Sequence, residues 1–140
     1  MEKFVVHGPC SLKGIVNISG AKNAAVAILP ATLLSTGKCH LENVPDISDI
    51  RAYIEILKSL GSKITYINNN EIIIDNSEVN SAIASYELTS KFRASYYLLG
   101  SLIGRFNDVQ ISLPGGCNLG ARPIDQHIKG FEALGAKVDT

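Results

Sequence analysis

The sequence predicts an α/β fold of repeated units in which helices lie inside and sheets face outward. Two apolar helical stretches, 24–34 and 94–103, each precede an alternating strand and then an amphipathic helix that ends at a glycine. A helix that is apolar on nearly all sides is typical of the interior, whereas alternation in a strand predicts one face in water. Because the same series of elements occurs twice, we expect two copies of one unit: helix, strand, helix, strand, strand.

The first twenty residues predict a β-hairpin that stands apart from these units. Residues 2–6 and 13–19 are rich in β-forming side chains, and Gly8-Pro9 between them favours a turn. We therefore expect a domain boundary between residues 1–20 and residues 21–140. The second part holds the first two units, of which the second is truncated.

The first unit opens with its apolar helix. Residues 19–23 begin this helix, and it continues through 24–34 and ends near Gly37. An alternating strand follows at 38–44, and we expect Pro45 to end it, because proline has no N–H to donate to a sheet.

The amphipathic helix and a hairpin complete the first unit. Gly61 follows the helix in the position expected of a left-handed C-cap. Strands at 63–67 and 71–75, joined by three asparagines, predict a hairpin. The apolar stripe of the helix consists of Ile47, Ile50, Ile54, Leu57 and Leu60.

The second unit repeats this order after the polar connection 76–87. Residues 89–93 begin its apolar helix, an alternating strand spans 108–113, and Gly135 ends its amphipathic helix. The chain reaches Thr140 before the last hairpin strand of this unit. That would leave a sheet edge open, so we interpret the chain as a piece of a longer protein. The stripe of the second amphipathic helix consists of Ile124, Ile128, Phe131 and Leu134.

The two copies differ between the strand and the amphipathic helix. More residues separate Pro114 from Gly135 than separate Pro45 from Gly61. The additional residues fall in the segment Gly115-Gly116-Cys117. An insertion confined to one copy favours a functional loop on a fixed scaffold.

This loop brings a thiol close to features that bind anions. Arg122 and the N–H groups of the helix that follows Pro123 can hold phosphate oxygens. A cysteine beside a guanidinium and a helix N-terminus can have a lowered pKa and act as a nucleophile or an acid. The alternative is a glycine-rich turn whose Cys117 only packs, since free cysteine is among the most often buried residue types.

Cations occupy matching positions where the two apolar helices begin. Lys22 and Lys91 correspond between the copies, and Arg93 follows shortly after Lys91. Helix N-termini and cations that meet at a common mouth would bind an anionic ligand. The alternative is that each is a solvated residue of a first turn.

The composition narrows the classes of function. Thirteen basic and thirteen acidic residues leave no net charge, which disfavours nucleic-acid or membrane-surface binding. No signal peptide or membrane-spanning run is evident. The cysteines Cys10, Cys39 and Cys117 and the three histidines lack metal-ligand spacing, so we expect no metal site. Free thiols fit a reducing compartment, and we expect a cytoplasmic protein.

Four segments together carry a resemblance to a known family. Ser19-Gly20-Ala21-Lys22-Asn23-Ala24, residues 92–95, residues 113–117 and residues 120–125 resemble the N-terminal part of the UDP-N-acetylglucosamine 1-carboxyvinyltransferases, enolpyruvyl transferases of peptidoglycan precursor synthesis. The resemblance runs the whole length of the chain. It implies an inside-out α/β fold of two lobes with three units each, in which residues 1–20 pack with the other lobe.

The resemblance also implies a reaction. The enolpyruvyl group of phosphoenolpyruvate moves to the 3′-hydroxyl of UDP-N-acetylglucosamine, phosphate leaves, and no cofactor takes part. The general base of the family is a carboxylate far downstream, so this chain needs its C-terminal remainder. We therefore expect the 140 residues alone to be inactive.

Residue roles follow from the same resemblance. Lys22, Asn23 and Arg122 would bind phosphoenolpyruvate. Cys117 would be the catalytic acid that helps to protonate the methylene carbon and expel phosphate. The ligands of UDP-N-acetylglucosamine would be Asn23, Arg93, Arg122, Pro123, Ile124, Asp125 and Gln126.

One departure and two alternatives accompany this interpretation. The family often has tryptophan where this chain has Tyr96-Tyr97, so we expect an aromatic wall with altered packing and leave Tyr97 as a weak candidate. One alternative function is a non-catalytic binding or structural module of the same fold. The other is a transferase like the sister enzyme that makes 5-enolpyruvylshikimate 3-phosphate, which lacks the cysteine loop.

Overall fold

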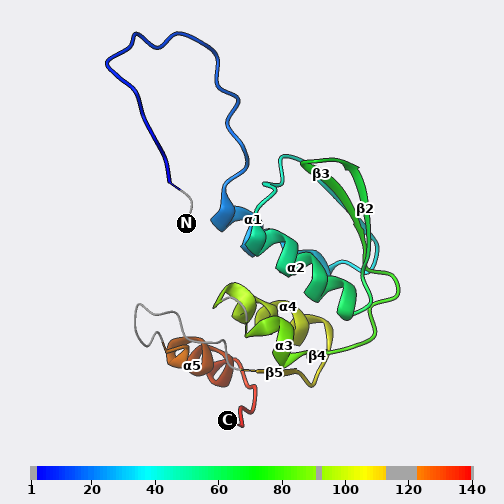
Figure 1. The fold of residues 1–140 in the computed structure, drawn as a ribbon. Helices are drawn as coiled ribbons and strands as arrows, with labels where there is room; N and C mark the ends of the chain where they lie inside the picture. The colour runs from blue at the N-terminus through cyan, green and yellow to red at the C-terminus, as the bar shows by residue number, and fades with distance from the viewer. Residues whose placement is uncertain (1–2, 91–92, 113–122, 140) are drawn as a thin grey trace.

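A computed structural model describes residues 3–90, 93–112 and 123–139 and confirms the α/β class (Figure 1). The first unit has the predicted order of helix, strand, helix, strand, strand. In chain order the elements are α1 (Lys22–Ala31), the 3-10 helix η1 (Thr32–Leu34), β1 (Lys38–Leu41), α2 (Ser48–Ser59), β2 (Lys63–Asn68), β3 (Glu71–Asp75), β4 (Ile83–Ala84), α3 (Tyr86–Thr89), the 3-10 helix η2 (Arg93–Tyr96), α4 (Tyr97–Arg105), β5 (Gln110–Ile111) and α5 (Asp125–Ala133).

The first unit forms an antiparallel sheet in the order β1-β3-β2. Ile72 and Ile74 point from β3 toward the helices and are buried, whereas the alternate residues Glu71, Ile73 and Asp75 are only half-buried. This alternation confirms a sheet that covers the helices on one face and meets solvent on the other. The first strand is shorter than predicted, since β1 ends at Leu41.

The end of α2 confirms the predicted glycine cap. Gly61 has a φ of +108°, and its N–H donates to the Lys58 carbonyl at 3.0 Å. The N–H of Ser62 donates to the Leu57 carbonyl at 3.0 Å. These two bonds form a Schellman motif, which turns the chain sharply from α2 into β2.

The burial of α1 is less complete than predicted. Val26, Leu29 and Leu33 are buried where α1 and η1 pack against α2 and α4, but Ile28 is 49% exposed and Leu34 is 58% exposed. The prediction of burial on all sides is therefore wrong for the part of the chain that the structure describes. An apolar face is buried only where another element covers it, and here α1 is covered on one side.

The second unit departs further from its predicted form. Within the range 89–103 predicted as one helix, the described residues form the end of α3, then η2 and α4. Within the predicted strand 108–113 they form only β5, which pairs in parallel with β4. The helix α5 and the left-handed Gly135 after it, with a φ of +96°, are confirmed. Leu134 of its apolar stripe is nevertheless 87% exposed, and α5 has no buried residue.

The predicted β-hairpin of residues 1–20 is wrong for the described residues 3–20, which contain no strand. Figure 1 shows this segment extended away from the helices, and the side chains of Phe4 and Ile15 are fully or almost fully exposed. Two isolated strands are marginally stable in water unless their apolar face packs on something. The proposed division at residue 20 stays a prediction.

The buried amide of Asn76 connects β3 to the helices. Its Nδ2 donates to the Thr32 carbonyl at 2.7 Å, and its Oδ1 accepts a hydrogen bond from the Ser62 hydroxyl at 2.7 Å. Both sides of the amide are therefore satisfied in an interior where an unpaired polar group would be costly.

The guanidinium of Arg105 joins α4 to the first unit. It donates to four backbone carbonyls at 2.8 to 3.3 Å. Backbone carbonyls at the end of a helix or just after a strand have no hydrogen-bond partner within that element. A planar guanidinium with five donors can bond to several of them at once. The acceptors are Leu33, Ser35, Asn76 and Val79.

Arg105→Met should lower the free energy of unfolding by about 2 to 3 kcal/mol, because four partly buried carbonyls lose a charged donor. Urea unfolding followed by circular dichroism measures this change. Arg51→Met is the matched control: Arg51 is exposed and pairs with the exposed Asp46, so its loss should cost less than about 1 kcal/mol. Equal effects of the two variants would contradict the role given to Arg105.

Candidate functional site

Lys22 and Asn23 lie in the first turn of α1, where helix N–H groups lack intrahelical partners. The N-cap residue, Ala21, is extended and provides no side-chain cap. A helix N-terminus without a side-chain cap keeps donors available for an anion, and the helix dipole favours negative charge there. Both residues are exposed.

Lys22 forms an ion pair with Asp49, a residue of the first turn of α2. The Lys22 side chain is 54% exposed, so this pair brings two helix N-termini together without burying the ammonium. The Asp49 carboxylate is favourably placed at the N-terminus of α2. An anionic ligand at Lys22 would therefore meet an ammonium group that already has a carboxylate partner.

Gly20 makes a close backbone contact just before α1. A Cβ at this position would lie 1.8 Å from the Asn43 carbonyl oxygen and 3.1 Å from Cδ of Pro45. Only glycine therefore allows the connection between β1 and α2 to lie against the start of α1. This contact determines where Lys22 and Asn23 lie relative to α2.

Two hollows of about 260 Å³ each flank this connection. The first lies between α1 and β1 and is lined mainly by apolar groups that include Ala24 and Ile28; the second lies beside α2 and includes Arg51. Lys22 and Asn23 line neither hollow. These predicted ligands are therefore on an open surface in this structure.

Arg93 begins η2, and two hydrogen bonds hold the backbone beside it. The Tyr53 hydroxyl donates to the Ala94 carbonyl at 3.3 Å. The Ser95 hydroxyl donates to the Thr89 carbonyl at 3.0 Å, and both of these residues are buried. The turn that carries Arg93 is thus fixed both to α2 and to the end of α3.

The start of α5 holds the other predicted nucleotide-sugar ligands that the structure describes. Pro123 and Ile124 precede α5, and Asp125 begins it. Gln126 donates from Nε2 to Oδ2 of Asp125 at 3.1 Å. The ring of His127 lies edge-on to the Tyr96 ring, with 5.1 Å between centroids, so α5 contacts η2.

This contact places the start of α5 near the turn that begins at Arg93. The sequence does not predict this contact of His127, because nothing in the local pattern indicates a partner on another element. Tyr96 and Tyr97 have ring centroids 4.7 Å apart. Their packing is consistent with the expected aromatic wall.

Cys117, Arg122 and Lys91 lie outside the described residues. The predicted meeting of Cys117 and Arg122 with Lys22 therefore stays a prediction. Cys10 is an exposed free thiol and Cys39 is a half-buried one.

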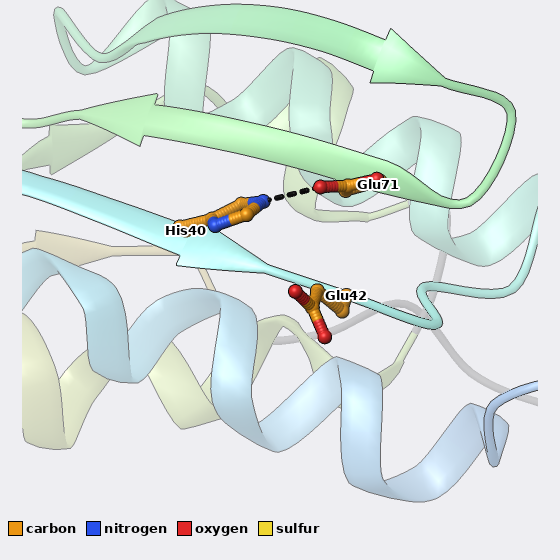
Figure 2. A group of neighbouring side chains, drawn as sticks. All are labelled: His40, Glu42 and Glu71. Carbon is orange, nitrogen blue, oxygen red and sulfur yellow. Dashed lines mark hydrogen bonds and ion pairs between the residues drawn. The ribbon is translucent and has the colours of Figure 1, made fainter.

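A group of possible metal ligands that the sequence reasoning missed lies on the sheet (Figure 2). Ligand atoms of His40, Glu42 and Glu71 lie within 4.8 Å of one another, and Nε2 of His40 is 2.7 Å from Oε1 of Glu71. The signal was the spacing of His40 and Glu42 in the predicted strand 38–44, but Glu71 comes close to them only through the pairing of β1 with β3. The bond between His40 and Glu71 accounts for their closeness without a metal.

In the described residues, every helix is too short or too polar to cross a lipid bilayer.

The chain is similar to known proteins over nearly its whole length. The family described as EPSP synthase (3-phosphoshikimate 1-carboxyvinyltransferase) matches residues 6–140. UDP-N-acetylglucosamine 1-carboxyvinyltransferase 3 of Caldanaerobacter subterraneus subsp. tengcongensis is 56% identical over 137 residues, which cover 98% of this chain and 33% of that protein. The corresponding enzyme 2 of Bacillus subtilis is 50% identical over 138 residues, which cover 99% of this chain and 32% of that protein.

A solved structure agrees with these sequence matches. The enolpyruvyl transferase NikO of Streptomyces tendae superposes with a TM-score of 0.61 and 29% identity, covering 71% of this chain and 23% of that one. The chain thus spans about a third of the length of the curated relatives that it matches. Since the family match extends over nearly the whole sequence, this chain belongs to the EPSP synthase family of carboxyvinyl (enolpyruvyl) transferases.

Proposed function

We propose that the whole protein containing this chain transfers the enolpyruvyl group of phosphoenolpyruvate to the 3′-hydroxyl of UDP-N-acetylglucosamine and releases phosphate. The observation that carries this proposal is the 50 to 56% identity, over nearly all of this chain, to proteins named for that activity. The cysteine in the loop after Pro114 favours it over shikimate 3-phosphate as the acceptor. The product belongs to peptidoglycan precursor synthesis, and we place the reaction in the cytoplasm.

Phosphoenolpyruvate binds at the start of α1 in this proposal. The N-terminus of α1 and the Lys22 ammonium attract the phosphate and carboxylate, and Asn23 supplies hydrogen bonds to both substrates. Lys22 exchanges its contact with Asp49 for the ligand. Arg122 adds a second cation for the same anion.

The nucleotide sugar binds between η2 and the start of α5. Arg93 begins the turn that Tyr53 and Ser95 hold, and the contact between Tyr96 and His127 supports the closeness of that turn to α5. Asp125 accepts a hydrogen bond from the uracil N–H. Arg122, Pro123, Ile124 and Gln126 form the remainder of this wall.

The chemistry is an addition followed by an elimination. The 3′-hydroxyl oxygen attacks C2 of phosphoenolpyruvate while Cys117 gives a proton to the methylene carbon, and a tetrahedral intermediate forms. Loss of a proton from the new methyl group then restores the double bond and expels phosphate. The carboxylate that takes the proton from the 3′-hydroxyl belongs to the remainder of the protein, so the 140 residues alone do not turn over.

The whole protein should release phosphate from phosphoenolpyruvate only when UDP-N-acetylglucosamine is present. A coupled phosphate assay measures the rate, with shikimate 3-phosphate as the control acceptor and the isolated chain as an inactive control. Release that depends on shikimate 3-phosphate would replace this proposal by the sister activity. Failure of both acceptors would favour a non-catalytic module.

An epoxide phosphonate should label Cys117 much faster than Cys10 or Cys39, because the arginine and helix N-terminus near Cys117 favour its thiolate. Peptide mass mapping of the whole protein after brief exposure locates the label. Cys117→Ser should remove it. Equal labelling of the exposed Cys10 would contradict an activated thiol at position 117.

Gly20→Ala should lower kcat/KM for phosphoenolpyruvate by about a hundredfold, because the added Cβ forces the start of α1 away from Asn43 and misplaces Lys22 and Asn23. Steady-state kinetics of the whole protein measure the loss. Gly100→Ala is the control, since its Cβ would meet nothing within 4 Å. If Gly20→Ala keeps wild-type kinetics, the contact does not position the site.

A further inference from the structure

One face of α2 contacts both regions that the proposed function assigns to substrates. Asp49 forms the ion pair with Lys22 at the start of α1. Tyr53, one turn later on α2, donates its hydroxyl proton to the carbonyl of Ala94, which directly follows Arg93. Residues four apart lie on the same side of a helix, so a single rigid element holds the two regions at a fixed separation.

Tyr53 is suited to holding these regions together because its hydroxyl keeps its proton and so stays a hydrogen-bond donor. The side chain is fully buried, and burial raises the pKa of the Tyr53 hydroxyl far above its usual value. The hydroxyl therefore remains protonated at neutral and mildly alkaline pH, where it can donate to the carbonyl. A buried tyrosine normally needs such a partner for its polar end.

The acceptor carbonyl lies in a turn that also bonds within its own segment and contacts α5 through the rings of Tyr96 and His127. The Ser95 hydroxyl bonds to Thr89, six residues earlier, whereas the Tyr53 bond joins residues 41 positions apart. The Tyr53 bond therefore links the turn at η2 to α2 of the first unit. Without it, η2 would remain a turn but could shift relative to α2.

We propose that Tyr53 is a positioning residue, whose hydroxyl fixes Arg93 at the start of η2 relative to Lys22 at the start of α1. This inference rests on the proposed function, because it takes Arg93 as a contact of the nucleotide sugar and Lys22 as a contact of phosphoenolpyruvate. Tyr53 touches neither substrate. It acts through the backbone of Ala94.

The test is Tyr53→Phe in the whole protein, since phenylalanine keeps the buried ring and removes only the donor. The KM for UDP-N-acetylglucosamine should rise about fivefold, as expected for the loss of one hydrogen bond, while kcat and the KM for phosphoenolpyruvate change less than about twofold. Calorimetric titration with UDP-N-acetylglucosamine alone should show a similar loss of affinity. Tyr86→Phe, at a site that is 66% exposed, is the matched control and should leave every value unchanged.

Two results for the variant would overturn the inference. Unchanged affinity for UDP-N-acetylglucosamine would show that the hydroxyl does not position the turn. Equal changes in both KM values and in kcat, together with a lower melting temperature, would show a general role in stability. A wild-type protein that does not turn over with UDP-N-acetylglucosamine would instead overturn the proposed function, and this inference with it.

Discussion

The packing of α2 is the constraint on which the rest of the structure depends. Its apolar side packs against β2, α1 and α3, and it contributes more fully buried large side chains than any other described element. Burying such a side chain stabilises the fold by about 2 kcal/mol. Because this helix is fixed on several sides, its polar contacts at Asp49 and Tyr53 are fixed as well, and Figure 1 shows it between the sheet and the helices of the second unit.

The first unit could be predicted from the sequence because its elements are determined locally. The alternating pattern predicted the strands, the apolar stripe predicted α2, and Gly61 marked the turn that needs a positive φ. The second unit could be predicted only in part: α5 and Gly135 follow from the local pattern, whereas the placement of η2 involves a bond to a residue distant in sequence, that of Tyr53 with Ala94. The strand β4 has two residues, too few for a recognisable period, and it lies in the predicted polar connection, whereas β5 lies within the predicted strand 108–113. Runs of β-forming side chains at the N-terminus predicted strands, but a strand also requires a neighbour to pair with.

The candidate site, too, could be predicted from the sequence only in part. Lys22, Asn23 and Arg93 could be named from the motifs around them, since a motif requires only neighbours in sequence. The residues that contact these regions from α2, Asp49 and Tyr53, could not be named from the sequence. They lie in an amphipathic helix whose pattern explains them as an ordinary first-turn acid and a core aromatic. Such contacts join residues far apart in sequence, so no local pattern predicts them. The same holds for the bond between His40 and Glu71 on the sheet.

The balance of charge affects how an anionic substrate would be recognised. With no net charge on the chain, no long-range field draws a phosphate toward it. The pairing of Lys22 with Asp49 further limits the positive potential at the start of α1. In the proposed reaction an anion must therefore offer more than its charge: it has to match the helix N–H groups and Asn23 at hydrogen-bond distance. Recognition of this kind depends on the placement of α1 to within a fraction of an ångström, and a close backbone contact such as that of Gly20 with Asn43 provides it.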